Sequence, residues 1–368
     1  MTTAAADNAP PVPPVWAPDQ TTRVAVPTVD ERSMTFTVAD ADRRLAAVRL
    51  WQEVRLPGDL LDFAWADGSW TLRVDRPAVD RMEYLLELEH PDGSRETVVD
   101  PANPRRVPGA FGDKSVVELP GYRAPWWVGR DRPEGRTTPL AVPARSLRVD
   151  VVGRLWAPHG IDDDVPLPLL VAHDGPEYDE LAGLTSYLAA LIGEGTIPPV
   201  RAALLAPGAR DDWYSANGAY TRALGLAVLP ALRVQVATTR VIGMGASLGA
   251  LAMLHAQRRY AGLFDALFLQ SGSFFHPRHD EHERRFSQYD RVVRAVRSVL
   301  RATGHHDPVP TVLTCGAIEE NVENNRIMAR ALAAQGYDVA LHEVRDVHNY
   351  VAWRDAFDPH LTQLLREE

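Results

Sequence analysis

The sequence predicts two structural regions, an antiparallel β-sandwich followed by a doubly wound α/β domain with a mostly parallel sheet. Three observations support this expectation. Short segments of alternating apolar and polar residues, separated by turn formers, fill residues 20–122. From about residue 146, apolar strand-like runs alternate with helical stretches, which favours a sheet covered by helices on both faces. At residues 245–249, an apolar run changes abruptly into a helical pattern around one serine.

The chain divides into four expected segments. Residues 1–19 are rich in Ala and Pro, with neither a basic start nor an apolar core, which predicts a disordered tail rather than a secretory signal. Residues 20–122 are the β-sandwich, residues 123–145 are a Gly-, Arg- and Pro-rich linker, and residues 146–368 are the α/β domain. The clearest sandwich strands are expected at 34–38, 47–51, 70–74 and 84–88.

The α/β domain is expected to alternate strands and helices along its whole length. Strands are expected at 147–152, 167–172, 201–206, 241–242, 266–270, 311–314 and 338–344. Helices are expected at 181–193, 220–232, 250–256, 283–302, 322–335 and 350–366. Sheets of this kind gather their functional groups at the carboxyl ends of the strands, so the loops that follow these strands are where chemistry is expected.

Composition and charge exclude several classes of partner. The 368 residues carry a formal net charge of −10, which gives no support for binding to nucleic acid or to an anionic membrane. No stretch approaches the roughly 18 apolar residues that a membrane span needs. The single cysteine, Cys315, rules out an internal disulfide framework and fits a reducing compartment. We therefore expect a soluble, cytoplasmic protein; its oligomeric state stays open.

One serine stands between a strand and a helix, in Gly245-Ala246-Ser247-Leu248-Gly249. A strand that turns sharply into a helix with Ser at the apex is typical of the nucleophile elbow of α/β-hydrolases. There the glycines leave room for neighbouring backbone, and the Ser is held in a strained, exposed geometry. The alternative is a Gly-rich turn with a surface serine. The flanking strand and helix favour the elbow, and Ser247 is the predicted nucleophile.

A serine nucleophile needs a base, and the base needs an acid that orients it. In α/β-hydrolases the acid and then the histidine follow the nucleophile, each in a loop after a strand. His348 follows the last expected strand and is the predicted base, whereas His342 and His360, in a strand and a helix, are expected to be structural. Glu319 and Glu320 follow the preceding strand; Glu319 is preferred as the acid, although both could instead cap the next helix.

The oxyanion that forms on attack needs two backbone N–H groups aimed at it. The first is expected from Leu248, directly after the nucleophile at the start of the helix. The second is expected from the loop at residues 173–177. Pro176 cannot donate, which leaves Gly175 or a neighbour.

The chain resembles the enterochelin (ferric enterobactin) esterase family, within the esterase D-like α/β-hydrolases. The matching stretches are 173–175, 209–217, 245–249, 270–275, 316–321 and 348–354. The resemblance implies an N-terminal immunoglobulin-like sandwich and a triad of Ser247, Glu319 and His348. It also implies hydrolysis of ester bonds in a catecholate siderophore (an enterochelin-type trilactone) or a related small-molecule ester, with no metal or other cofactor.

Two departures from the family pattern lie near the expected site. The family often has Gly-Gly-His-Asp where this chain has Asp346-Val347-His348-Asn349, and often a Leu-Asp-Gly loop where this chain has His173. Fold and triad do not select the substrate. Feruloyl or acetyl ester hydrolysis and acyl transfer therefore remain alternatives, as does a catalytically silent binding protein.

Several residues are candidates for contacting the substrate. Arg210 and Trp213 lie where the family tends to face its substrate, and an Arg beside aromatic rings could pair with catecholate oxygens; a surface salt bridge is the alternative. Phe274 could line an aromatic acyl pocket or could be buried. Residues 276–290 contain three His, and a solvated lid is favoured over a metal site. The Trp pair 126–127 is expected to cap the interface between the domains rather than to line the cleft.

Overall fold

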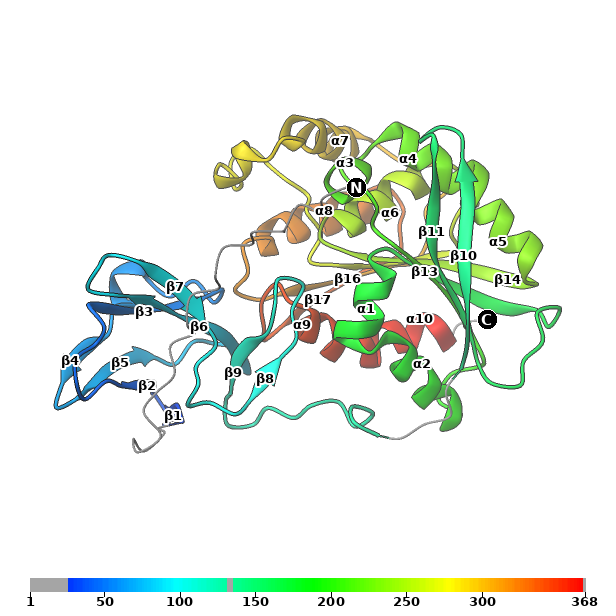
Figure 1. The fold of residues 1–368 in the computed structure, drawn as a ribbon. Helices are drawn as coiled ribbons and strands as arrows, with labels where there is room; N and C mark the ends of the chain where they lie inside the picture. Colours follow the sequence, from blue (N-terminus) through cyan, green and yellow to red (C-terminus); the bar gives the residue numbers. More distant parts are fainter. Residues whose placement is uncertain (1–25, 131–134, 367–368) are drawn as a thin grey trace, which may run out of the picture.

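The computed structural model describes residues 26–130 and 135–366. The chain forms a smaller all-β region, on the left of Figure 1, and a larger region in which helices cover a mixed β-sheet. The expected tail at residues 1–19 lies outside the described residues. No helix in the described part is long and apolar enough to cross a membrane.

The all-β region consists of two antiparallel sheets that share one core. The first sheet has the order β1-β2-β5-β4 and the second β3-β6-β9-β8, with β7 also paired to β6. Their bounds are β1 Thr28–Val29, β2 Ser33–Ala39, β3 Ala47–Gln52, β4 Ala64–Ala66, β5 Ser69–Asp75, β6 Arg81–Glu89, β7 Arg95–Val98, β8 Arg106–Val107 and β9 Lys114–Glu118. Apolar side chains of both sheets, such as Phe36 and Leu72 from one and Leu50 and Leu86 from the other, form a single buried cluster. The four predicted strands correspond to β2, β3, β5 and β6, and this agrees with an all-β region.

The mixed sheet has eight strands among the described residues, in the order β10-β11-β13-β12-β14-β15-β16-β17. Their bounds are β10 Arg136–Ala144, β11 Val149–Ala157, β12 Leu167–Ala172, β13 Arg201–Leu205, β14 Thr238–Ala246, β15 Ala266–Gln270, β16 Thr311–Gly316 and β17 Val339–Val344. The strands from β13 to β17 are parallel, whereas β10 and β11 are antiparallel. The chain passes from β12 to β13 on one side and returns to β14 on the other, so the order reverses at β12.

The first strands of this sheet differ from the expectation. Residues 123–145 were expected to be a linker, but β10 lies within them and pairs with β11 from Arg136 to Ala144. The strand expected at 147–152 begins only at Val149, because residues 145–148 form the turn of this hairpin, with Arg148 at φ +60°. The alternating pattern of β10 was masked by the Pro and Arg content of the stretch.

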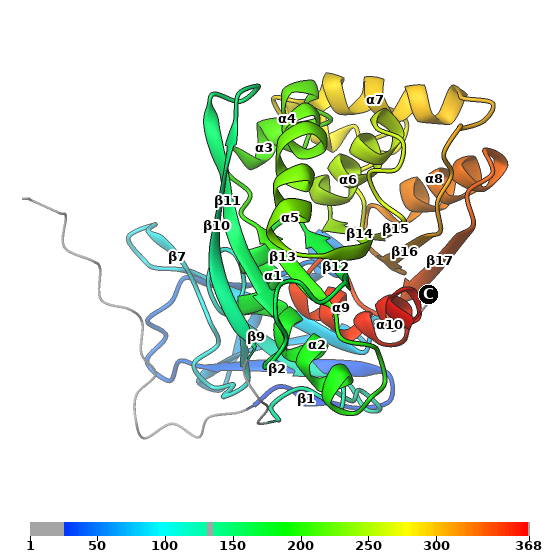
Figure 2. The same ribbon diagram turned by 90° about the vertical axis from the view of Figure 1, so that its right-hand side faces the viewer.

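Helices cover both faces of the mixed sheet (Figure 2). One face carries α3 Arg210–Trp213, α4 Gly218–Ala223, α5 Leu229–Gln235, α6 Leu248–Arg259, α7 Tyr289–Arg301 and α8 Val322–Ala334. The other carries α1 Gly175–Ala182, α2 Leu184–Gly193, α9 Tyr350–Asp355 and α10 Thr362–Arg366. Short 3-10 segments lie at Gly58–Leu60 and His282–Arg285, and π-helical segments at Leu224–Val228 and Phe357–Leu361.

Besides the helix expected at 283–302, which begins only at Tyr289 after the 3-10 segment His282–Arg285, two expected helices are interrupted. The helix expected at 181–193 is split because Gly183 takes a left-handed conformation (φ +63°) between α1 and α2. The closing helix expected at 350–366 is broken at Asp358, whose backbone is extended because Pro359 follows it. The helical pattern of apolar residues continues across both breaks, so the sequence pattern predicted one continuous helix in each case.

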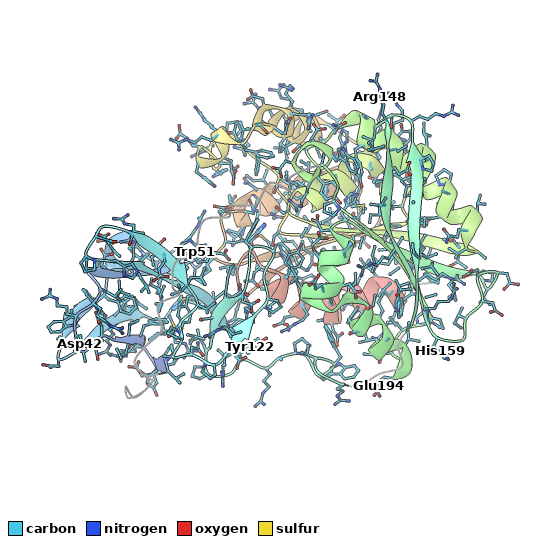
Figure 3. All side chains as sticks on the ribbon, in the orientation of Figure 1. Asp42, Trp51, Tyr122, Arg148, His159 and Glu194 are labelled. Carbon is cyan, nitrogen blue, oxygen red and sulfur yellow. The ribbon has the colours of Figure 1, made fainter. Side chains whose placement is uncertain are left out.

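The two regions are joined by specific contacts. The hydroxyl of Tyr122, labelled in Figure 3, donates to Asp355 Oδ2 at 2.7 Å. Asp80 N–H donates to Arg345 O at 2.8 Å, and the Arg345 side chain donates to Asp80 Oδ1. Val347, from the loop before α9, is buried in the apolar cluster of the all-β region. The loop after β17 is therefore built into both regions.

Candidate active site

Ser247 is the residue between the end of β14 and the start of α6. Its backbone has a conformation that L-residues rarely adopt, with φ +55° and ψ −125°. A Cβ on Gly245 would lie 2.6 Å from the backbone of Gly249, so no larger residue fits there. A Cβ on Gly249 would lie 3.2 Å from His173. The close packing of these glycines holds the strained turn in place, and such strain is concentrated at functional sites.

His348 and Glu319 come from the loops after β17 and β16. The side chain of Glu319 is 2% exposed, and its Oε2 lies 3.6 Å from His348 Nδ1. This is longer than a hydrogen bond, as catalytic contacts often are before substrate binds. Burial lowers the pKa of His348, but the Glu319 carboxylate raises it, with smaller contributions from Glu53 and Glu320, and the net shift is upward. Glu319 therefore favours the protonated imidazole.

Two further groups orient the Glu319 carboxylate. Ser271 Oγ donates to Oε2 at 3.0 Å, and the Cys315 thiol donates to Oε1 at 2.6 Å. Ser271 Oγ in turn accepts from the indole N–H of Trp353 at 3.0 Å. With both oxygens held, Glu319 presents a fixed acceptor towards His348.

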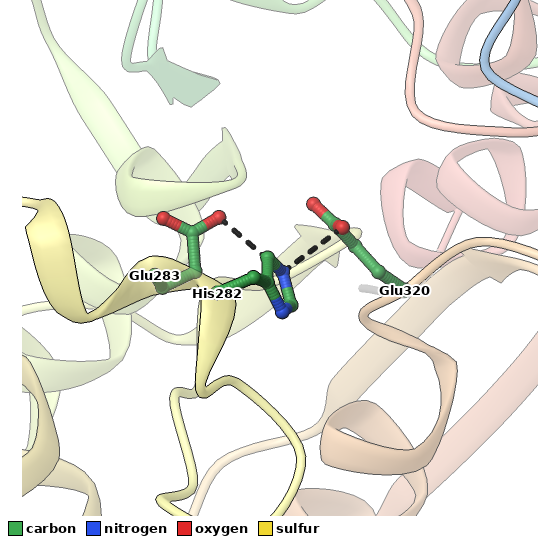
Figure 4. A group of neighbouring side chains, drawn as sticks. All are labelled: His282, Glu283 and Glu320. Atoms are coloured by element: carbon green, nitrogen blue, oxygen red, sulfur yellow. Dashed lines mark ion pairs between the residues drawn. The ribbon is translucent and has the colours of Figure 1, made fainter.

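The adjacent Glu320 points elsewhere. Its Oε2 lies 3.1 Å from His282 Nε2 and 3.5 Å from Arg55 Nη2 on the molecular surface. Figure 4 shows His282 between Glu283 and Glu320, and the ligand atoms of these three residues lie within 4.8 Å of one another. Of the three histidines in the segment 276–290, only His282 joins this group. His282 and Glu320 are exposed, and Arg55 also contacts the Glu320 carboxylate. The group is a surface ion-pair cluster.

The hydroxyl of Ser247 is directed to a neighbouring serine. Its Oγ is 3.0 Å from Oγ of Ser273, and the Ser273 N–H donates to Ser247 O at 3.0 Å. Within residues 26–130 and 135–366, no hydrogen bond joins Ser247 to His348, although both line the same cavity. The structure thus brings the three predicted residues close together, but Ser247 and His348 are not hydrogen-bonded to each other in the described residues.

The two predicted oxyanion donors are both located at helix ends. Leu248 and Gly175 are the first residues of α6 and α1, where N–H groups have no partner inside the helix. In the loop after β12, His173 N–H donates to Met244 O and Asp174 N–H to Tyr214 Oη. The N–H groups of His173 and Asp174 are thus already used within the described residues, and Gly175 stays the predicted donor of that loop. A Cβ there would lie 2.3 Å from the Leu204 backbone, which requires glycine.

His173 replaces the leucine that the family often has at this position, and the structure gives it a structural role. It is fully buried between Tyr214 and Tyr220. Its Nδ1 donates to the Gly249 carbonyl at 3.0 Å, and its Nε2 accepts from Tyr220 Oη at 2.8 Å. Burial lowers the pKa of His173 to about 4, so the imidazole is neutral and ties α6 to α4.

A cavity of about 560 Å³ lies over Ser247 and His348. The mixed-sheet region contributes Asp174, Glu177, Pro207, Arg210, Asp211, Asn349, Tyr350 and Trp353 to its lining. The all-β region contributes Glu53, Glu83, Lys114 and the loop 108–111, in which the side chain of Phe111 is fully exposed. The cavity is thus formed jointly by the two regions.

The three predicted substrate-contacting residues have different positions. Arg210 lines the cavity, but its guanidinium binds both oxygens of the buried Asp174 carboxylate at 2.8 Å. Trp213 is 8% exposed and stacks on Tyr220 in the core. Phe274 is 1% exposed in the same core, with its ring against Gly272. The expectation that Trp213 and Phe274 face the substrate is corrected: neither is among the lining residues.

Several of the tryptophans that the structure describes pack against other side chains. Trp127 packs on Tyr187 and Phe357 at the face of α2, so it belongs to the mixed-sheet region rather than to a cap between the regions. Trp70 is in the core of the all-β region, and Trp51 is half-buried, with Lys114 Nζ over its ring. The spacing of these tryptophans in the sequence does not tell which of them are buried and which are partly exposed.

Arg81, on β6, connects the all-β region to the loop that carries His348. It is 1% exposed, and its Nη1 lies 3.2 Å from Asp346 Oδ2 and 3.1 Å from Asn349 Oδ1. Its Nη2 donates to Glu83 at 2.7 Å. Asn349 Oδ1 also accepts from Ala352 N–H and so caps α9. Asp346 and Asn349, where the chain departs from the family pattern, are thus the partners of a buried arginine.

Several residues of the site were missed by sequence reasoning. Ser271 and Ser273 lie in a stretch that matched the family, but nothing in their spacing gave them a role. Arg81 and Lys114 lie in strands of the all-β region, more than 100 residues from the elbow. Of the missed residues, Phe111 could have been predicted to contact a ligand, because it is an aromatic residue in a Pro- and Gly-rich turn, where it has little to pack against.

The comparisons with known proteins show the family and the fold of this chain. The Esterase family model matches residues 146–364. The enterobactin esterase from Shigella flexneri, in the presence of 2,3-di-hydroxy-N-benzoyl-serine, is similar to this chain with a TM-score of 0.73 at 19% identity, over 92% of this chain and 96% of that one. The ferric enterobactin esterase from Salmonella typhimurium is similar with a TM-score of 0.71 at 18% identity, over 91% of this chain and 92% of that one.

A ferulic acid esterase is similar over a smaller part of the chain, with a TM-score of 0.51 at 15% identity, 64% coverage of this chain and 98% of that one. Among curated protein sequences, none matches. At these identities the structural likenesses concern the fold, whereas the family model covers more than half of the chain, including Ser247, Glu319 and His348. This chain therefore belongs to the Esterase family and has the fold of the enterobactin esterases over most of its length.

Proposed function

We propose that this protein is a serine hydrolase of carboxylic esters that works through an acyl-enzyme on Ser247. The observation that carries the proposal is the strained backbone of Ser247 between β14 and α6, in the same cavity as His348. In the proposed reaction, Ser247 Oγ attacks the ester carbonyl while His348 takes its proton and passes it to the leaving alcohol. Water, activated by His348, then releases the acid. Glu319 orients the imidazole.

The N–H groups of Leu248 and Gly175 are proposed to bind the oxyanion. The fold assignment that goes with this mechanism is an α/β-hydrolase domain preceded by an immunoglobulin-like sandwich. The reversal of strand order at β12 and the helices on both faces support the former, and the two antiparallel sheets support the latter. No metal or organic cofactor takes part in the proposed steps.

The proposed substrate class rests on the likeness to solved structures. Enterobactin-type esters come first because the enterobactin esterases share the fold over both regions of the chain. Feruloyl esters come second, since the ferulic acid esterase shares only part of it. Transfer of the acyl group to another alcohol would use the same acyl-enzyme and is distinguished by its product.

Labelling with a fluorophosphonate, followed by mass spectrometry of the adduct, tests the proposal. Ser247 and Ser273 have hydroxyls 3.0 Å apart, so the two serines provide matched variants. We expect an adduct on Ser247 in the unchanged protein and in Ser273→Ala, and none in Ser247→Ala. Turnover of a phenyl ester should fall by roughly 10⁴-fold or more in Ser247→Ala. An adduct on Ser273, or full turnover by folded Ser247→Ala, would reject the assignment.

A further inference from the structure

Ser271, directly after β15, has a strained backbone that its neighbours hold in place. Its φ of +46° lies in the left-handed region that residues other than glycine rarely adopt. The Ser271 N–H donates to Thr314 O at 2.7 Å, and the Ser271 carbonyl accepts from Asn321 Nδ2 at 3.3 Å. Ser271 is 1% exposed. Backbone strain of this kind is concentrated at functional sites, although the proposed reaction steps do not use Ser271.

The proton of the Ser271 hydroxyl has a fixed direction. Ser271 Oγ lies 3.0 Å from Trp353 Nε1 and 3.0 Å from Glu319 Oε2. An indole N–H can only donate, so Ser271 Oγ accepts from Trp353, and its own proton is left for the Glu319 carboxylate. Because a serine hydroxyl otherwise rotates to suit its surroundings, the indole decides where this hydroxyl points.

The indole of Trp353 is in turn held by several neighbours. Trp353 is 7% exposed and packs edge-on against Tyr350, with ring centroids 4.8 Å apart. The Trp353 carbonyl accepts from Gln270 Nε2 at 3.0 Å, and Gln270 Oε1 accepts from Tyr178 Oη at 2.9 Å. Because Gln270 and Tyr178 are fully buried and hydrogen-bonded, the indole N–H stays directed at Ser271.

Trp353 also contacts His348 and the cavity. Its ring lies edge-on to the His348 ring, with centroids 5.1 Å apart and an interplanar angle of 80°. It lines the cavity together with Ser247 and His348. The Glu319 oxygen that receives the Ser271 proton is Oε2, the same atom that faces His348 Nδ1 at 3.6 Å. Trp353 therefore touches the histidine directly and reaches the acid through Ser271.

We propose that Trp353 and Ser271 are positioning residues of the reaction: Trp353 fixes the Ser271 hydroxyl, and Ser271 holds the Glu319 oxygen that faces His348. The inference rests on the proposed function of Ser247 and adds two residues to it. Neither residue forms or breaks a covalent bond. Both act on the orientation of the acid and the base, and a small misplacement of such groups slows a reaction strongly.

A double-mutant cycle on kcat tests the proposal. Trp353→Phe keeps an aromatic ring in the cavity and removes the N–H, so kcat for a phenyl ester should fall about tenfold while KM stays within about twofold. Ser271→Ala removes the hydroxyl and should lower kcat by about 10- to 100-fold. Because the indole acts through Ser271, the double variant should match Ser271→Ala within about twofold. Losses that multiply, or full kcat in either single variant, would overturn the inference.

Trp70→Phe is the matched control for Trp353→Phe. Trp70 Nε1 donates to Asp40 Oδ2 at 2.9 Å in the core of the all-β region. Both substitutions remove one buried indole hydrogen bond, so the melting temperatures should fall by similar amounts. Trp70→Phe should leave kcat within about twofold of the unchanged protein. An equal loss of kcat in the two variants would show that the loss comes from stability, and the inference would be wrong.

A readout without turnover separates this inference from the proposed function. The nitrogen NMR signal of His348 Nδ1 reports its contact with Glu319, and its disappearance in His348→Gln assigns it. We expect this signal to move in Ser271→Ala, which leaves the Trp353 ring in place, and to stay in Trp70→Phe. An unmoved signal in Ser271→Ala would reject the inference even in a protein that hydrolyses esters. A moved signal in a protein whose Ser247 takes up no fluorophosphonate would reject the proposed function and support the hydrogen-bond chain.

Discussion

The two regions that meet at the cavity contribute different kinds of residue. The mixed-sheet region supplies every group of the proposed reaction, and Ser247, Glu319 and His348 all lie within the part of the chain that matches the Esterase family. The all-β region supplies Arg81, which binds the loop of His348, and lining residues such as Glu53 and Phe111. The residues of the proposed reaction therefore lie within the family match, whereas the cavity around them is lined by residues from both inside and outside that match.

The largest effect is expected within the mixed-sheet region, from the two adjacent glutamates. Glu319→Gln keeps the shape but removes the charge beside His348, so kcat should fall by roughly 10²- to 10⁴-fold. Glu320→Gln should change kcat by less than about threefold, because Glu320 pairs with His282 and Arg55 on the surface. Steady-state kinetics on a phenyl ester decide this, and equal losses in the two variants would show that the triad acid is misassigned.

The next effect would show whether the all-β region positions the catalytic histidine. Arg81→Met removes the buried cation between Asp346, Asn349 and Glu83, and we expect kcat to fall by about 10- to 100-fold with KM nearly unchanged. Removing one partner of a buried pair also costs roughly 3–5 kcal/mol of unfolding free energy, which denaturant titration measures.

Arg345→Met is the control for Arg81→Met. Arg345 joins the same two regions through Asp80, but both side chains are about half exposed. This variant should leave kcat within about twofold and lower the unfolding free energy by less than about 1 kcal/mol. Similar kinetics in the two variants would mean that Arg81 has no role beyond holding the regions together.

The pH dependence of kcat/KM tests the coupling between His348 and Glu319. His348 acts as a base only when neutral, and Glu319 raises its pKa above the usual value. Activity should therefore be present at alkaline pH and be lost as pH falls through the raised pKa, so the acidic limb lies above the range expected for a free histidine. In Glu319→Gln this limb should move to lower pH, and an unmoved limb would assign the titration to another group.

The smallest effect is expected at the mouth of the cavity. Phe111→Ala removes a fully exposed ring that lines the cavity from the all-β region. KM for an aromatic ester should rise by about two- to tenfold with little change in kcat, because stacking contributes roughly 0.5–1.5 kcal/mol. The melting temperature should stay the same, since the ring has no packing to lose. An aliphatic ester serves as the control and should show no change in KM.

Much of the fold was predictable because it is encoded locally. Strands such as Ala266–Gln270 and helices such as Val322–Ala334 follow from short hydrophobic patterns and have nearly the predicted bounds. The strand Arg136–Ala144 was missed because its Pro and Arg content resembles a linker, and its edge pairing with the Val149–Ala157 strand is a tertiary property. Likewise, Gly183 and Pro359 break helices whose periodicity continues through them.

The site was predictable in part for the same reason. The order of serine, acid and histidine after successive strands located Ser247, the acid pair and His348, because strand ends meet at one edge of a parallel sheet. The choice between Glu319 and Glu320 needed the side-chain directions. Phe274 lies in a loop and Trp213 at the end of the short helix α3, and only the packing around them decides that both are buried.

By itself, the sequence predicted the esterase family and the residues of the proposed reaction, since the elbow and the order of its partners depend on local turns and on strand succession. Only the tertiary structure decided what surrounds that chemistry. Arg81 meets Asp346 across 265 positions of sequence, and Arg210 is bound by Asp174 instead of standing free for an anion. These are contacts between side chains distant in the chain, and a distant contact has no periodicity that a sequence can display.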